Sequence, residues 1–218
     1  MYLVRPPFLM KKFSRSMIWR LKTDKKEICL SFDDGPHPEI TPWVLDQLKA
    51  VEAKAVFFCV GENVQRYPDV YARILAEGHL TGNHTHNHLN GWKSDSKKYL
   101  NNIAACAEEV KSSFFRPPYG MLKKSQARRI RKNYTIVMWD VLSGDFDRNT
   151  SPEKCLDNAL RYTREGSVVV FHDSNKAKEN LNYTLPKYLK EMIVRGFSFV
   201  LPEPISSSPL RGPVSSSR

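Results

Sequence analysis

The chain has 218 residues, enough for one sizeable hydrophobic core, and we expect a single folded domain. Lysine and arginine number 34 against 23 aspartate and glutamate residues, so the formal net charge is +11. A basic surface favours anionic partners. We interpret the positive charge as a general property of the surface and not as a specific anion site, and we expect no nucleic-acid site. The four cysteines lie far apart in the sequence, which argues against a zinc knuckle or a dense disulfide framework.

We expect residues 1–25 to be an N-terminal extension that packs on the domain. They mix basic and apolar residues but lack the long apolar run and the small-residue cleavage site of a signal peptide. No stretch of the sequence is apolar enough to span a bilayer, although residues 10–21 leave weak contact with a membrane surface open. We therefore expect a protein that is cytoplasmic or associated with a membrane surface, and a function in the cell envelope remains open. We also expect a monomer.

Strand-like and helix-like stretches alternate between residues 26 and 201, which we expect to form the domain. Apolar runs predict strands at 28–33, 54–60, 80–83, 113–116, 134–139, 167–172 and 197–201. Helix starts are indicated at Thr41-Pro42, Pro68 and Ser151-Pro152-Glu153. This alternation predicts an α/β fold with a parallel sheet, most simply closed as a small or incomplete (β/α) barrel, with an open doubly wound sheet as the alternative. Residues 202–218 are rich in Pro and Ser and predict a mobile tail.

The first predicted strand ends in two adjacent carboxylates, within the sequence SFDDGP. Asp33 and Asp34 carry like charges that would repel each other and resist ionising if they were crowded together. A bound cation would remove this conflict. If a cation is bound here, its other ligands must come from elsewhere in the chain.

Polar clusters also follow four later strands, in the sequences GNHTHNHLN, FFRPPYG, VMWDVLSGDFD and VVVFHDS. The carboxyl ends of the strands in a parallel barrel open onto one face, where loops build the active site. We therefore expect these clusters to meet the Asp33-Asp34 pair on that face.

The spacing of His84 and His88 suits a metal site. Four residues apart, both imidazoles would lie on one side of a helical turn, with His86 pointing away. One added carboxylate gives a His-His-Asp set that leaves a coordination position open for water, as in catalytic zinc sites. Zinc is the expected divalent metal, and iron, cobalt or nickel suit the same ligands.

The motifs SFDDGP, HTHNH, RPPYG, WDVLSGDF and VVVFHD, in this order, resemble those of the polysaccharide deacetylases, the NodB homology domain also called carbohydrate esterase family four. The resemblance runs from about residue 26 to 201. It implies a distorted (β/α) barrel with seven strands. It also implies a metal-dependent hydrolase that acts on an acetylated glycan.

The same resemblance implies roles for individual residues. Asp33 corresponds to the general base, and Asp34, His84 and His88 correspond to the metal ligands. Arg116 resembles the arginine that pairs with the base and orients it.

Further roles follow from the later motifs. The resemblance implies that the backbone N–H of Tyr119 helps to hold the oxyanion and that His172 is the general acid. Asp145 is the expected partner of the His172 imidazole, with Asp140 as the competing carboxylate. The expected substrate-binding residues are Pro117, Tyr119, Trp139 and Phe146, where Phe146 replaces the tryptophan that is usual in the family.

We therefore expect an enzyme that removes acetyl groups from N-acetylated amino sugars and releases acetate. Chitin-like oligomers, peptidoglycan and acetylated exopolysaccharide remain open as substrates, because subsite loops choose among them. An O-acetyl esterase acting on xylan-type polysaccharide is an alternative with the same constellation. A non-catalytic protein that binds cell wall or nucleic acid is an alternative from another class.

Overall fold

The structure is a computed structural model that describes residues 2–14 and 16–204. The predicted Pro/Ser-rich tail, 202–218, lies outside the described residues from position 205 onward. None of the helices in the described ranges is both long and apolar enough to cross a membrane.

Parallel strands form the centre of the molecule. They lie in the order β5-β4-β3-β2-β1-β7-β6, and β8 pairs with the start of β1. The described strands are β1 (Glu27–Asp33), β2 (Ala55–Cys59), β3 (Leu80–Asn83), β4 (Phe114–Phe115), β5 (Thr135–Ile136), β6 (Val141–Leu142), β7 (Val168–His172) and β8 (Ser198–Phe199). This sheet curls into the distorted (β/α) barrel that the sequence predicted, and the prediction of the fold is confirmed.

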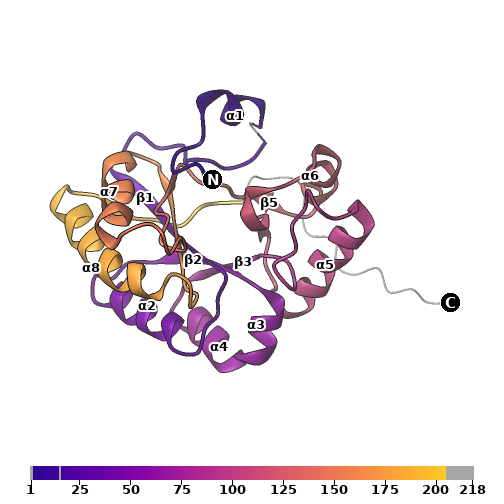
Figure 1. Cartoon of the computed structure of the whole chain (residues 1–218), viewed down its shortest axis with the longest axis horizontal. Coiled ribbons are helices and arrows are strands. Elements are labelled where there is room, and N and C mark those ends of the chain that lie inside the picture. The colour runs from indigo at the N-terminus through magenta and orange to yellow at the C-terminus, as the bar shows by residue number, and fades with distance from the viewer. Residues whose placement is uncertain (1, 15, 205–218) are drawn as a thin grey trace.

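Helices surround the strands on three sides. In Figure 1, α7, α8 and α2 lie on one side, α3 and α4 lie below, and α5 and α6 lie on the other side. The described helices are α1 (Phe8–Phe13), α2 (Ile40–Lys49), α3 (Gly61–Arg66), α4 (Pro68–Ala76), α5 (Ser96–Glu109), α6 (Lys124–Ile130), α7 (Pro152–Tyr162) and α8 (Lys178–Val194), with the short 3₁₀ turn η1 (Pro118–Gly120). The predicted helix starts are present, and the Ser151 side chain caps α7 by accepting a hydrogen bond from the Lys154 N–H.

The central strands are buried on both faces, as expected where helices cover a parallel sheet. Every residue of β2 is buried, and so is β1 after its first residue. Aromatic rings fill the space on one side of these strands, where Phe32 stacks on Phe57 and on Phe171. This packing fixes the strand register and therefore the positions of the residues at the strand ends.

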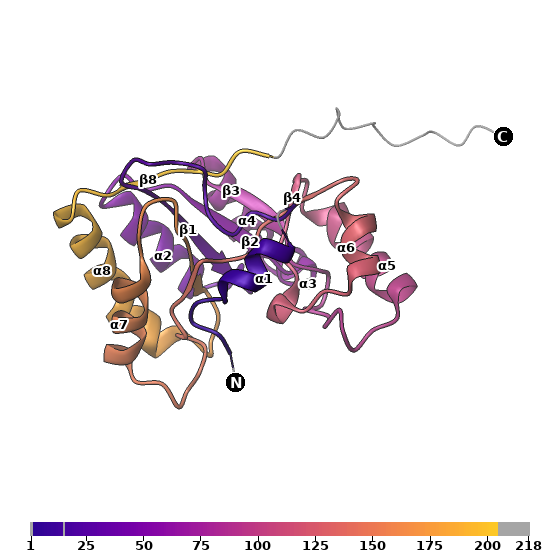
Figure 2. The ribbon, with the colours of Figure 1, turned by 90° about the horizontal axis from the view of Figure 1, so that it is seen from above.

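The N-terminal segment, defined here as residues 2–14 and 16–21, lies between the two ends of the sheet path. The N–H of Ile18 donates to the carbonyl of Ile136 in β5, and the N–H of Leu142 in β6 donates to the carbonyl of Val4. Figures 1 and 2 both show α1 between the α7–α8 pair and the α5–α6 pair. The segment therefore covers the side of the barrel where the strand path ends.

The fifth strand is shorter than the predicted stretch 134–139. Its ladder with β4 covers Thr135 and Ile136, while Val137 pairs instead with Ile18 of the N-terminal segment. The carbonyls of Val137 and Met138 accept hydrogen bonds from an arginine side chain inside the barrel. These long-range contacts leave a short β5 and a separate β6 that the apolar pattern did not reveal.

Candidate active site

Strand register brings the predicted motifs to one edge of the sheet. Asp33 at the end of β1 is aligned with His172 at the end of β7. Asn83 at the end of β3 is aligned with Phe115 of β4, so His84 and Arg116 follow at the same level. Because all these strands are parallel, their carboxyl ends converge as the sequence predicted.

Asp34, His84 and His88 form a cluster of potential metal ligands, called here the His-His-Asp cluster. One ligand atom from each residue lies within 4.8 Å of the other two. The Nε2 atoms of His88 and His84 lie 3.1 Å and 3.7 Å from Oδ1 of Asp34. That Oδ1 atom is buried and has no hydrogen bond of ordinary geometry among the described residues. The donor set therefore fits a divalent cation.

The ring of His84 is oriented for coordination. Its Nδ1 lies 2.8 Å from the carbonyl oxygen of Arg116, and because a carbonyl can only accept, Nδ1 carries the proton. Burial lowers the pKa of His84 to about 4, so the ring is neutral at pH 7 and its Nε2 lone pair faces Asp34. A ligating histidine held by a backbone carbonyl is the usual arrangement in metal sites.

The prediction of a helical turn at 84–88 is wrong, although the two histidines do meet. The segment after β3 is a loop in which Thr85 and His88 have positive φ angles of 65° and 56°. The side chain of Asn83 accepts from the N–H of Thr85, and the Thr85 hydroxyl accepts from the N–H of Leu89. These side-chain bonds to the backbone replace helical hydrogen bonds and fold the loop back on itself.

Asp33 and Asp34 face different partners. Asp34 has a φ of 80°, so the backbone turns at the strand end, and its carboxylate faces the histidines. Burial alone would raise the pKa of Asp34, but the neighbouring His88, His172 and His84 lower it below its usual range. Asp33 instead accepts a hydrogen bond of 2.7 Å from Nη1 of Arg116. The two adjacent carboxylates are thereby kept apart.

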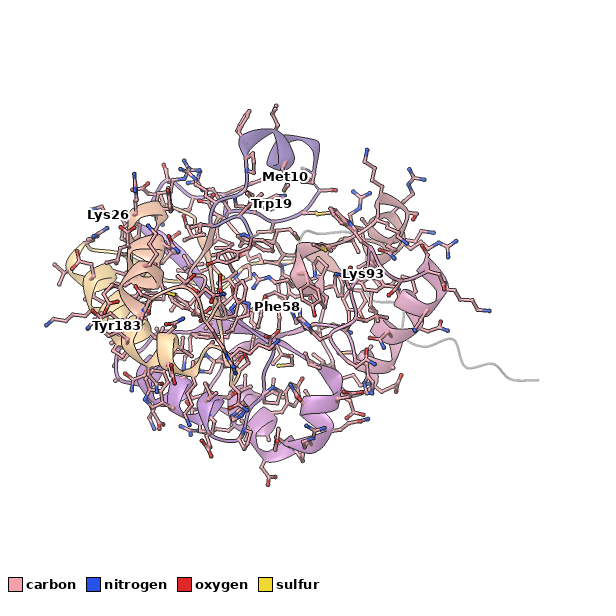
Figure 3. All side chains as sticks on the ribbon, viewed as in Figure 1. Met10, Trp19, Lys26, Phe58, Lys93 and Tyr183 are labelled. Atoms are coloured by element: carbon pink, nitrogen blue, oxygen red, sulfur yellow. The ribbon has the colours of Figure 1, made fainter. Side chains whose placement is uncertain are left out.

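Arg116 is completely buried inside the barrel, with 0% of its surface exposed. Besides Asp33, its guanidinium donates to the Ser31 hydroxyl and to the carbonyls of Val137 and Met138. Its Cζ atom also lies 4.0 Å from the centre of the Phe58 ring, which occupies the middle of the molecule in Figure 3. All these contacts fix the guanidinium, and therefore the Asp33 carboxylate, in one orientation.

His172 is held by Asp145 and not by Asp140. Nδ1 of His172 lies 2.8 Å from Oδ1 of Asp145, and the backbone N–H of His172 donates to Oδ2 of the same carboxylate. Burial alone would lower the pKa of His172, but the Asp145 carboxylate raises it to about 9. Asp140 lies elsewhere, where it accepts hydrogen bonds from Arg164 and Ser167. The structure therefore selects Asp145 as the carboxylate beside the imidazole.

The predicted substrate-binding residues differ in how accessible they are. Tyr119 has 60% of its surface exposed, and its ring packs edge-on against His88 with the centroids 4.6 Å apart. The ring of Phe146 packs against the imidazole of His172, with the two centroids 4.7 Å apart. Trp139 is half-buried and contacts the position of Gly120, and Pro117 is buried, which leaves little of the proline ring accessible to a sugar.

Several residues that support the site were missed by the sequence reasoning. Asn63 donates to the carbonyl of Asp34, and Asn180 donates to the carbonyl of Asp145, each from a helix distant in sequence. Asp173 accepts from the N–H of Gly35 and from the hydroxyl of Thr41, and it holds the turn after Asp34. Only Asp173 carried a sequence signal, because it follows His172 in the motif VVVFHD.

Comparison with known proteins places the chain in a family. A family model described as polysaccharide deacetylase matches residues 20–139, more than half of the chain. The chain belongs to the polysaccharide deacetylase family. The matched range contains the His-His-Asp cluster and the Arg116–Asp33 pair of this deacetylase, while Asp145 and His172 lie beyond it.

Relatives of the deacetylase act on acetylated glycans according to their names. A peptidoglycan-N-acetylglucosamine deacetylase of Bacillus cereus is 35% identical over 81% of this chain and 67% of its own. A chitooligosaccharide deacetylase of Bradyrhizobium is 28% identical over 81% of this chain and 84% of its own. Among solved structures, a peptidoglycan N-acetylglucosamine deacetylase bound to a substituted benzamide has a TM-score of 0.78 and 31% identity, over 89% of this chain and 94% of that one.

Replacing Arg116 with Lys should weaken both the fold and the reaction. Lysine keeps the charge but cannot donate in a planar fork to Asp33, Val137 and Met138 together. Because each buried acceptor left without a donor costs ~1–3 kcal/mol, we expect the free energy of unfolding to fall by several kcal/mol. In the folded variant we expect kcat to fall and KM to change less, because the buried guanidinium cannot touch the substrate. Thermal unfolding and steady-state kinetics test this, with exposed Arg128→Lys as the control. Unchanged kcat with a raised KM would contradict it.

Replacing Asp145 with Asn should lower the pKa of His172. In the chelator-treated protein we expect the wild-type imidazole to titrate near a pKa of about 9, since Asp145 stabilises its charged form. The His172–Asp145 pair should contribute fully to the free energy of unfolding below a pH of about 6.5, and this contribution should be lost as the pH rises through about 9. In Asp145→Asn the hydrogen-bonded carboxylate is lost while burial still lowers the pKa, so the pKa should fall even though the charges of Asp34 and Asp33 remain. NMR titration measures both, and Asp147→Asn in the same loop is the control; an unchanged pKa in Asp145→Asn would disprove the assignment.

Proposed function

We propose that this deacetylase is a metal-dependent hydrolase that removes the acetyl group from N-acetylglucosamine units of a polysaccharide. The observation that carries the proposal is that one sheet edge holds a metal-ligand cluster, a buried carboxylate fixed by arginine and an imidazole fixed by a second carboxylate. The names of the relatives supply the substrate class, since they act on peptidoglycan or chitooligosaccharide.

Asp34, His84 and His88 are the residues that would hold the metal. A bound divalent cation would supply Lewis acidity, which polarises the acetyl carbonyl and lowers the pKa of water. We propose zinc, because it suits two imidazoles and one carboxylate with an open position. Cobalt or nickel would suit the same ligands.

Asp33 is the proposed general base. Its carboxylate accepts the proton of the water that attacks the acetyl carbonyl, while Arg116 holds the carboxylate in place. The backbone N–H of Tyr119 donates to the carbonyl oxygen as negative charge develops on it. The ring contact between Tyr119 and His88 places this residue beside the His-His-Asp cluster.

His172 is the proposed general acid. With its pKa raised to about 9 by Asp145, the imidazole carries a proton at neutral pH and can give it to the nitrogen of the breaking amide bond. The C–N bond then breaks, and the products are acetate and the free amine of the sugar. Water supplies the hydroxyl of the acetate, so the reaction balances as a hydrolysis.

The proposed function is tested by acetate release from peptidoglycan, chitooligosaccharides and acetylxylan. We expect release from one or both N-acetylated substrates, its loss with a chelator and its return with added zinc or cobalt. Asp34→Ala, His84→Ala and His88→Ala should lose the metal, whereas Asp33→Asn should keep the metal and lose turnover, because ligands set affinity and the base acts on water. Metal analysis of each variant accompanies the assay. Release from acetylxylan alone would identify an O-acetyl esterase, and no release from any of them with metal bound would indicate a binding protein.

Replacing His172 with Ala should affect amide and ester substrates differently. An amine leaves poorly without protonation, whereas the phenolate of an activated aryl acetate leaves unaided. We expect His172→Ala to lower N-deacetylation by ~10²–10⁴-fold and aryl-acetate hydrolysis far less. The ratio of the two rates at equal metal content is the measurement. Equal losses on both substrates would exclude His172 as the leaving-group acid.

A further inference from the structure

The N-terminal segment runs along the strand that leads into the Asp145 loop, defined as residues 144–150. The N–H of Leu142 in β6 donates to the carbonyl of Val4 at 2.8 Å. Nε1 of Trp139 donates to the carbonyl of Leu3 at 3.3 Å. Figure 3 shows Trp19, from the same segment, between α1 and the strands. The start of the chain is therefore held beside the motif that carries Asp145.

Tyr2 of this segment contacts the Asp145 loop at three positions. Its ring lies against that of Phe146, with a centroid distance of 4.9 Å and an angle of 60° between the planes. Its hydroxyl is 3.0 Å from the hydroxyl of Thr150 at the far end of the loop. At the near end, a Cβ added to Gly144 would lie 2.5 Å from the Tyr2 hydroxyl oxygen. Tyr2 thus contacts the loop at both ends and in the middle.

The same loop determines the orientation of His172. Asp145 binds the Nδ1 atom and the backbone N–H of His172, each at 2.8 Å. The ring of Phe146, the next residue, packs edge-on against the imidazole, with a centroid distance of 4.7 Å and an angle of 61° between the planes. Asn180 of α8 holds the other side of the loop, where it donates to the carbonyls of Asp145 and Thr150. Tyr2 and Asn180 therefore support the loop from two different elements.

Gly144 makes the contribution of Tyr2 more important. Its φ of 82° lies in the left-handed region, and it precedes Asp145 directly. Glycine has the widest conformational freedom of any residue, so the backbone at this point resists movement only through its neighbours. The ring of Tyr2, which lies over Gly144 and on Phe146, is such a neighbour.

We propose that Tyr2 is a positioning residue for His172. It acts through Phe146 and the Asp145 loop, and it keeps the imidazole where it can protonate the leaving nitrogen. This inference rests on the proposed function, because it assumes that His172 is the leaving-group acid. A displacement of ~1 Å in a catalytic group can cost ~10²-fold in rate, so a loosened loop should have a measurable effect.

The test compares variants of the full chain. Tyr2→Ala removes the ring and the hydroxyl, whereas Tyr2→Phe removes only the hydrogen bond to Thr150. Phe8→Ala is the matched control, since it removes an aromatic ring from the same segment at a side chain that is 77% exposed. Each variant is assayed on an N-acetylated oligosaccharide and on an activated aryl acetate, with metal content and thermal unfolding measured in parallel.

We expect Tyr2→Ala to lower kcat for N-deacetylation by about tenfold or more and aryl-acetate hydrolysis by less than about twofold. Tyr2→Phe should recover most of the loss, because the ring contact with Phe146 remains. Phe8→Ala should match the wild type on both substrates. Equal losses on both substrates in Tyr2→Ala, or no loss at all, would overturn the inference.

His172→Ala separates failure of this inference from failure of the proposed function. If His172→Ala shows selective loss on the amide and Tyr2→Ala does not, only the role of Tyr2 is wrong. If His172→Ala itself shows no selectivity, the proposed acid is wrong. An NMR measurement is independent of activity: the proton shared by Nδ1 of His172 and Asp145 should exchange faster with water in Tyr2→Ala than in Tyr2→Phe. Equal exchange rates in the two variants would contradict the positioning role.

Discussion

The ion pair between Arg116 and Asp33 is the interaction on which both the barrel and the site depend. The interior of a (β/α) barrel is normally filled by layers of branched apolar side chains, but here a buried guanidinium lies among the apolar residues and contacts the Phe58 ring. Burying two charges is unfavourable unless every donor and acceptor is satisfied. Arg116 meets that condition by binding Ser31 of β1 and the carbonyls of Val137 and Met138 after β5. The same contacts that stabilise the charge also join distant strands and orient the carboxylate.

The neighbouring carboxylates show how one turn of backbone creates two chemical roles. Asp33 continues β1 and faces the interior, where a permanent positive charge is available. Asp34, one residue later, has a positive φ and faces the imidazoles of His84 and His88. A carboxylate beside two imidazole nitrogens suits a shared metal ion, whereas a carboxylate held by arginine suits the role of a general base. Separating the two environments requires the strand to end at this position.

Much of the fold and of the site could be predicted because it depends on local patterns. Apolar runs such as 167–172 identify strands, and parallel strand ends must share one face, so Asp33, His84 and His172 could be brought together without coordinates. The prediction of a helical turn at 84–88 was wrong because side chains, including that of Asn83, accept hydrogen bonds from the loop backbone. The spacing of residues in the sequence does not reveal such bonds. The prediction of one strand at 134–139 missed the separate strands β5 and β6. Their division depends on Ile18 and Val4, which lie more than a hundred residues away.

The supports of the site also differ in rigidity. Asp33 and His172 are placed by paired strands, and His84 follows β3 directly, so strand register determines where their backbones lie. The imidazole of His172 has a second requirement, because its partners Asp145 and Phe146 belong to a loop that begins at a glycine. Strand pairing cannot hold such a loop, so its position must come from whatever packs on it. Here those contacts come from Asn180 of α8 and from Tyr2 at the opposite end of the sequence, which makes the N-terminal segment part of the site's architecture.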